Sequence, residues 1–141
     1  MKNFLRSLVP ISVQVPVKYM INKWRSQLEA ELQLLPFLVK RGETVIDIGG
    51  NRGQYTYALW QLGSKVQVFE PNPVCSQILV AWASNKDSVT VHPVGLSDQS
   101  GEAVLHIPVD EFGNEHDASA SLGDGIAANT RDEKVLLSSL D

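Results

Sequence analysis

The chain has 141 residues, of which 43% are hydrophobic and 20% are charged, and its formal net charge is -4. This composition excludes a disordered chain and is sufficient for the core of one small domain. The single cysteine, Cys75, excludes an internal disulfide framework and favours the reducing cytoplasm. Because the chain is acidic and has no basic patch interleaved with aromatic residues, nucleic acid is not an expected partner.

Residues 1–31 are predicted to form a leader and an amphipathic helix that precede the main domain, residues 32–141. Before Glu29 the chain has no acidic residue and five basic ones, which are Lys2, Arg6, Lys18, Lys23 and Arg25. Residues 3–17 are too often interrupted to form a membrane span of about 20 residues. Two interpretations stay open: weak contact of a basic arm with a membrane surface, or packing of this segment on the domain or on a partner.

Between Val17 and Val39, apolar residues recur every three or four positions, which predicts one or two helices with a break or a new start at Pro36. The predicted buried face of this region comprises Met20, Trp24, Leu28, Leu32 and Leu35.

The segment from Thr44 to Glu70 has the pattern of a strand, a tight turn, a helix and a second strand. A β-branched run ending at Ile48 breaks into Gly49-Gly50-Asn51-Arg52-Gly53, and helical spacing then continues to Leu62. At such a turn the backbone lies close to a ligand because no Cβ intervenes, and we expect the first helical N–H groups to point outward unpaired. The turn therefore suits a nucleotide or an amino-acid carboxylate.

Glu70 ends the second strand, where a carboxylate can accept hydrogen bonds from two ribose hydroxyls. A dinucleotide fingerprint G-x-G-x-x-G starting at Gly49 would require glycine in place of Asn51 and Gln54. A nicotinamide-dependent dehydrogenase is therefore disfavoured. Tyr55, next to the turn, either contacts substrate or packs with its hydroxyl in water.

A second helix is predicted after Glu70. Asn72 is a suitable N-cap and Pro73 a suitable first residue, since proline has no N–H to leave unpaired. The helix should extend to about Ser84 and bury Cys75, Ile78, Leu79 and Trp82.

The remaining chain predicts strands and one long loop. Val89–Val94 is expected to be an edge strand because Pro93 cannot donate a hydrogen bond, and Gly101–Ile107 a half-buried antiparallel strand. Pro108–Lys134 is polar and predicts a long loop, either functional or disordered, in which residues 119–122 cover a substrate or are mobile. Val135–Leu140 predicts a final strand. His92, His106 and His116 are isolated, and no metal-ligand pattern is present in the sequence.

Three sequence blocks together resemble the FkbM-type methyltransferases, which use S-adenosylmethionine. The blocks are Val45 to Thr56, Phe69-Glu70-Pro71-Asn72-Pro73 and Gly95-Leu96-Ser97-Asp98, and the resemblance covers roughly Leu32 to the C-terminus. It implies an α/β fold of the Rossmann-like class I methyltransferase type, with strand order 3-2-1, and methylation of a hydroxyl on a sugar, glycan or natural product. The implied cofactor-binding residues are Asp47, Gly49, Gly50, Asn51, Gly53, Glu70 and Leu96. The Gly95 to Asp98 segment is either close to the adenine or a plain turn.

In this family a further Asp-x-Glu-Gly motif follows the point at which the sequence ends, at Asp141. We therefore expect the chain to represent the first half of such a domain, with one edge of strand 44–48 bare, marginal stability and self-association through that edge. Two functional hypotheses follow. One is an active methyltransferase, for which the sequence identifies no catalytic residue, and the other is a noncatalytic fragment that binds the cofactor weakly or binds a partner chain.

Overall fold

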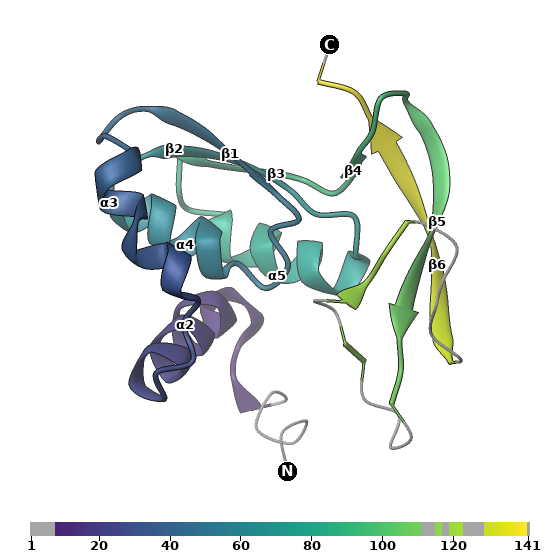
Figure 1. Cartoon of the computed structure of the whole chain (residues 1–141), viewed down its shortest axis with the longest axis horizontal. Coiled ribbons are helices and arrows are strands. Elements are labelled where there is room, and N and C mark those ends of the chain that lie inside the picture. Colours follow the sequence, from purple (N-terminus) through teal and green to yellow (C-terminus); the bar gives the residue numbers. More distant parts are fainter. Residues whose placement is uncertain (1–7, 111–114, 117–118, 123–128, 141) are drawn as a thin grey trace.

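The computed structural model describes residues 8–110, 115–116, 119–122 and 129–140. This part of the chain is an α/β structure with one parallel sheet, a layer of helices and a second small sheet (Figure 1). Its first elements are η1 (Ile11–Val13), α2 (Gln14–Trp24), η2 (Ala30–Gln33), α3 (Leu35–Leu38), β1 (Thr44–Ile48), α4 (Gln54–Gln61), β2 (Lys65–Phe69), α5 (Pro73–Ala83) and β3 (Val89–His92). They are followed by β4 (Gly95–Leu96), β5 (Gly101–Pro108) and β6 (Thr130–Ser138).

The first sheet is parallel, with strand order β1-β2-β3, which confirms the predicted order. Asp47 of β1 pairs with Val68 of β2, and Val66 pairs with Val89 of β3. The strand predicted over Val89–Val94 ends earlier, at His92. Pro93 follows directly, and its missing N–H accounts for the end of the ladder.

Helices α4 and α5 lie on one face of this sheet (Figure 1). Side chains alternate along each strand, so Val66 and Val68 point into the helical layer and are fully buried. On the other face, Ile46 and Ile48 of β1 are 49% and 64% exposed. Within the described residues β1 pairs with β2 alone, as expected for a strand with one bare edge.

The main core lies between this sheet and the helices. It is formed by Val15, Leu59, Val66, Val68, Ile78, Leu79, Trp82, Ala83 and Val89. Val15 lies in the segment predicted to precede the main domain, and its place in this cluster shows that α2 packs with α5 and β2. The new start predicted at Pro36 is present, since α3 begins at Leu35 and has Pro36 in its first turn.

The predicted buried face of the N-terminal helix is wrong at two positions. Met20 is 64% exposed and Trp24 is 84% exposed. The face of α2 that contacts the domain carries instead Val15, Tyr19 and Asn22. The Tyr19 ring lies 4.9 Å from the Tyr57 ring, and Asn22 Nδ2 donates to Gln54 Oε1 over 2.9 Å. Apolar spacing alone missed this face because two of its residues are a tyrosine and an asparagine, which contact α4 through a ring pair and a hydrogen bond.

The second sheet has the order β4-β6-β5, with β5 and β6 antiparallel, as predicted for Gly101–Ile107. It has its own small core, formed by Leu105, Ile107 and Val135. The prediction of a loop from Pro108 to Lys134 is wrong after residue 129, because β6 begins at Thr130. The polar residues at the start of β6 are held in the strand by backbone pairing with β5. A hydrophobicity pattern does not reveal such pairing.

Part of the predicted loop is attached to β5. Ser121 and His106 exchange two backbone hydrogen bonds of 2.9 and 3.0 Å in an antiparallel bridge. Ala120 packs against the core of the second sheet. Residues 119–122 are therefore fixed against this sheet, whereas loop residues 111–114, 117–118 and 123–128 lie outside the described residues. In the part of the chain that the structure describes, no helix is long and apolar enough to cross a membrane.

We predict that Leu79→Ala lowers the free energy of unfolding by about 2–5 kcal/mol, because it leaves a cavity in the main core. Val80→Ala is the matched control, since Val80 follows on the same helix but is 48% exposed, and it should cost well under half as much. Urea unfolding followed by circular dichroism measures both. Equal losses in the two variants would contradict the position of the core.

Candidate functional site

The turn after β1 is closed by hydrogen bonds to the end of β2. The N–H groups of Gly49 and Gly50 both donate to the Phe69 carbonyl, over 2.8 and 3.2 Å, and the Asn51 N–H donates to Glu70 Oε2 over 2.6 Å. These three N–H groups, which precede α4, are therefore paired. Their acceptors are the carbonyl of Phe69, the last residue of β2, and the carboxylate of Glu70, the residue that follows it.

The glycines of the turn have different roles. A Cβ on Gly50 would collide with Cγ2 of Val68, and a Cβ on Gly53 would lie 2.9 Å from side-chain atoms of Leu79 and Val15. These two positions require glycine because the turn packs directly on the core. Gly49 differs, because it has a φ of +75° and a Cβ there would meet no atom within 4 Å. Open space for a ligand is therefore found next to Gly49.

Glu70 connects the turn to the start of α5. Glu70 is 6% exposed, and the second oxygen of its carboxylate, Oε1, accepts the Asn72 N–H over 2.7 Å. Each carboxylate oxygen thus receives a backbone donor. The sequence predicted that this carboxylate lies beside the turn, and the structure places it there.

Asp47 binds the other side of the turn. Its Oδ2 accepts the hydroxyl of Thr56 over 2.5 Å, in the first turn of α4. Burial raises the pKa of Asp47, while hydrogen bonds from the side chain and the backbone of Thr56 act in the opposite direction. The geometry therefore gives this carboxylate a structural task, which is to hold the start of α4 against the end of β1.

The start of α5 is capped as predicted. Asn72 is 1% exposed, and its side chain accepts the Val74 N–H over 3.0 Å. Cys75 is fully buried, as expected, and its Sγ also lies 3.5 Å from Oδ1 of Asn51. Asn51 thus contacts both β2 and α5, so that the turn, the strand end and the cap form one unit.

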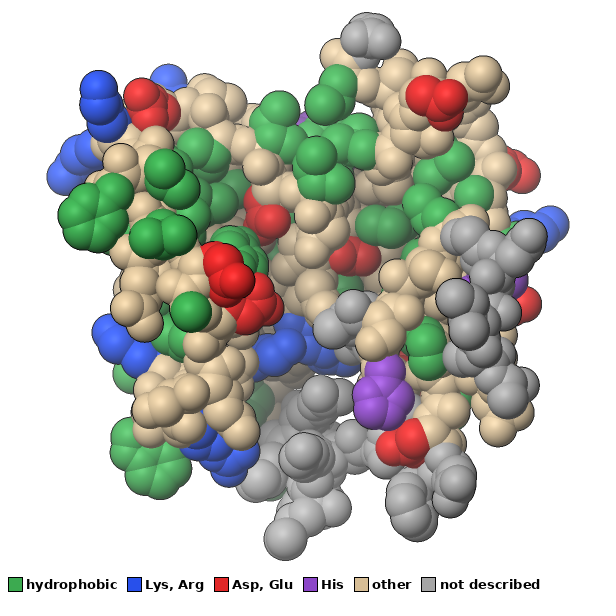
Figure 2. Space-filling view, viewed as in Figure 1, with side chains coloured by type: hydrophobic (Ala, Val, Ile, Leu, Met, Phe, Trp, Pro, Cys, Tyr) green, Lys and Arg blue, Asp and Glu red, His purple; other side chains and the backbone are tan. Residues whose placement is uncertain are grey.

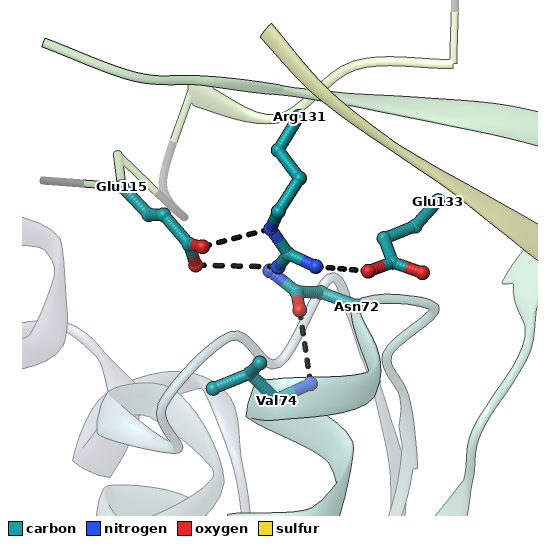
Figure 3. A network of polar contacts seen from close by, with 5 residues as sticks. All are labelled: Asn72, Val74, Glu115, Arg131 and Glu133. Carbon is teal, nitrogen blue, oxygen red and sulfur yellow. Dashed lines mark hydrogen bonds and ion pairs between the residues drawn. The ribbon is translucent and has the colours of Figure 1, made fainter. Parts of the chain in front are cut away.

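The second sheet borders this unit. A Cβ on Gly95 would lie 3.6 Å from Pro71, the residue after Glu70, and the half-buried Leu96 follows in β4, where it pairs with Ser138. Figure 3 shows Arg131 pointing from β6 toward Asn72, between Glu115 and Glu133. Its Nε lies 2.7 Å from Glu115, and it also pairs with Glu133.

These three charged residues were not predicted as part of the site, because they fall in the segment interpreted as a loop. Arg131, Asp132 and Glu133 are all charged, so the run has no alternation of apolar and polar residues that would have predicted a strand.

Residues considered as candidates elsewhere have local partners. The His92 ring stacks on Phe69 with centroids 4.4 Å apart and bonds to Gln67, while His106 bonds to Asp132 over 2.7 Å. Tyr55 donates its hydroxyl to Glu29 over 2.6 Å, which raises the pKa of Tyr55 to about 12. The hydroxyl of Tyr55 therefore has a protein partner, in contrast to the interpretation in which it lies in water. The described residues contain no group of three or more side chains that could hold a metal ion.

No family model matches this chain, and the curated proteins and the solved structures gave no significant match. The function is therefore argued from the residues and their geometry.

We predict that Asp47→Asn makes the stability of the protein less dependent on pH. A raised pKa means that the folded state retains the proton above 3.8, the ordinary value for aspartate, so the wild type should lose stability as the pH rises from that value through the raised pKa. Asparagine is neutral throughout and can still accept the Thr56 hydrogen bond. The variant should therefore gain stability relative to wild type between about pH 4 and about pH 7.

Urea unfolding across this range tests the effect, with Asp98→Asn, at an exposed position, as the control. A stability difference between Asp47→Asn and wild type that stays constant with pH would contradict the assignment.

Proposed function

We propose that this protein binds S-adenosylmethionine between the Gly49–Gly53 turn and Glu70 and is a methyltransferase acting on a hydroxyl group. The observation that carries the proposal is the Glu70 carboxylate, which is held 2.6 Å from the Asn51 amide at the carboxyl end of the parallel strands. Ligands of open α/β sheets bind at this edge. The parallel sheet is compatible with a partial Rossmann-like methyltransferase domain, which is the fold we propose.

The residues at this edge of the sheet fit the adenosyl part of the cofactor. The Glu70 carboxylate is held beside the turn by the N–H groups of Asn51 and Asn72, and we propose that it binds the ribose hydroxyls. Gly49 leaves room for the ligand because its Cα faces open space. Leu96 and Gly95 follow β3 next to Pro71, and we propose that this segment borders the adenine.

The pairing of the turn favours a sulfonium cofactor over a dinucleotide. A pyrophosphate needs free N–H groups at the turn, whereas those of Gly49, Gly50 and Asn51 have partners in or next to β2. The carboxylates of Asp47 and Glu70 would also repel phosphate. S-adenosylmethionine has no phosphate, and its sulfonium is positive, so both features suit it.

The bound cofactor would supply the reactive methyl group, and the protein would contribute mainly orientation. Glu70 would fix the ribose, and the Asp47–Thr56 hydrogen bond would hold α4 below the turn. We assign no catalytic base, since His92 and His106 have the local partners given above and His116 lies 3.6 Å from Asp110. The proposed acceptor is a hydroxyl on a sugar, a glycan or a natural product.

A second candidate function is a noncatalytic chain that binds the cofactor weakly or binds a partner. The free edge of β1 and the exposed Ile46 and Ile48 favour it, because unpaired strand edges associate with other chains. The two candidates differ in turnover. Labelled S-adenosylmethionine, incubated with the protein and a pool of hydroxylated acceptors, should give methyl incorporation only if the chain is an enzyme.

We predict that Glu70→Gln weakens binding of S-adenosylhomocysteine by about 1–3 kcal/mol, because the ribose loses a charged acceptor. Titration calorimetry measures the change. Glu102→Gln is the control, since it removes the same charge from an exposed position on β5, and it should bind like wild type.

Near-ultraviolet circular dichroism of the Trp60–Trp82 pair, whose rings lie 5.6 Å apart, establishes whether Glu70→Gln is folded. A folded variant with the affinity of wild type would refute the role of Glu70. Tighter binding of a nicotinamide dinucleotide than of S-adenosylhomocysteine would refute the cofactor.

A further inference from the structure

A cavity of about 320 Å³ lies beside α2, apart from the residues that hold Glu70. Its apolar wall includes Val17 and Ile21, one helical turn apart on α2, and Ile78 of α5. The volume is at the lower end of the range for small-molecule sites, about 300–1,000 Å³. The cavity is therefore large enough for a compact organic molecule with an apolar body.

Basic side chains also line this cavity. They come from two parts of the chain: Lys18 and Arg25 from α2 and its C-terminal end, and Arg52 from the glycine-rich turn. Among the described residues that line the cavity, none is acidic. Figure 2 shows acidic side chains near the middle of this face of the molecule and basic side chains below them.

We propose that this cavity binds a small organic anion, with its apolar body against Val17, Ile21 and Ile78 and its anionic group held by Arg25, Arg52 and Lys18. A phosphate or sulfate ester fits best, because the arginine guanidinium presents paired donors to such oxyanions. The apolar wall excludes water from one side of the ligand and thereby strengthens these contacts.

The walls of the cavity are fixed before any ligand binds. Two residues that line the cavity have hydrogen bonds. Asn22 donates to Gln54 of α4 over 2.9 Å, and Gln14 donates to the Val9 carbonyl over 3.1 Å. Val15, on the same helix, is 1% exposed in the main core. Because α2 is tied to the domain on both sides of Lys18, its basic residues need little reordering on binding, which favours affinity.

This inference stands on the cavity and does not depend on the proposed cofactor. The two sites are adjacent, since Arg52 directly follows Asn51, which is bonded to Glu70. If both proposals hold, an anion in this cavity lies beside the cofactor turn, where a methyl acceptor has to be. The acceptor would then carry a negative group.

The test uses naphthyl phosphate as the probe, with naphthol and inorganic phosphate as comparisons, each titrated into the full chain by calorimetry. Naphthyl phosphate should bind at least about tenfold more tightly than either comparison, because only it uses both the apolar wall and the cations. Arg25→Gln and Val17→Asp should each weaken its binding by about tenfold.

Lys23→Gln is the matched control, because it removes the same charge from α2 at an exposed position outside the cavity, and it should change the affinity less than about twofold. Wild type that binds naphthyl phosphate but not S-adenosylhomocysteine would refute the proposed cofactor alone, and the reverse would overturn this inference alone, so failure of either proposal is visible separately. Equal affinity for naphthol and naphthyl phosphate, or equal losses in Lys23→Gln and Arg25→Gln, would overturn the inference.

Discussion

The hydrogen bonds between the Glu70 carboxylate and two backbone N–H groups hold this structure together at the carboxyl edge of the parallel sheet. A buried carboxylate without partners costs several kcal/mol, so the chain must supply donors where β2 ends. Asn51 provides one from the turn after β1, and Asn72 provides the other from the cap of α5. One side chain therefore sets the position of two helices relative to the sheet.

The surroundings follow from this constraint. Because the turn folds onto the end of β2, Gly50 and Gly53 must be glycine to avoid the core. The same fold leaves Gly49 open and Arg52 facing the cavity beside α2. The turn consequently lies between two carboxylates, those of Asp47 and Glu70, and a cavity lined by basic side chains. This is the arrangement on which we base the proposals of a positively charged cofactor and an anionic ligand.

Local sequence signals predicted the parts of the fold that depend on a few neighbouring residues. The run from Thr44 through the turn to Glu70, and the Asn72-Pro73 cap, were predicted correctly because their backbone requirements are met within a few positions. The paired state of the turn, the inward face of α2 and the start of β6 were not. Each depends on a distant partner: Glu70 for Asn51, Tyr57 for Tyr19, and β5 for Thr130. Apolar periodicity carries no information on such pairs.

The most direct test of the account is the amide NMR spectrum of the protein with and without S-adenosylhomocysteine. If the ribose binds to the Glu70 carboxylate, the hydrogen bonds that this carboxylate accepts from Asn51 and Asn72 must change in strength. We therefore predict that the amide resonances of these two residues shift more than those of β5 and β6. Saturating ligand that leaves both resonances in place would contradict the central claim.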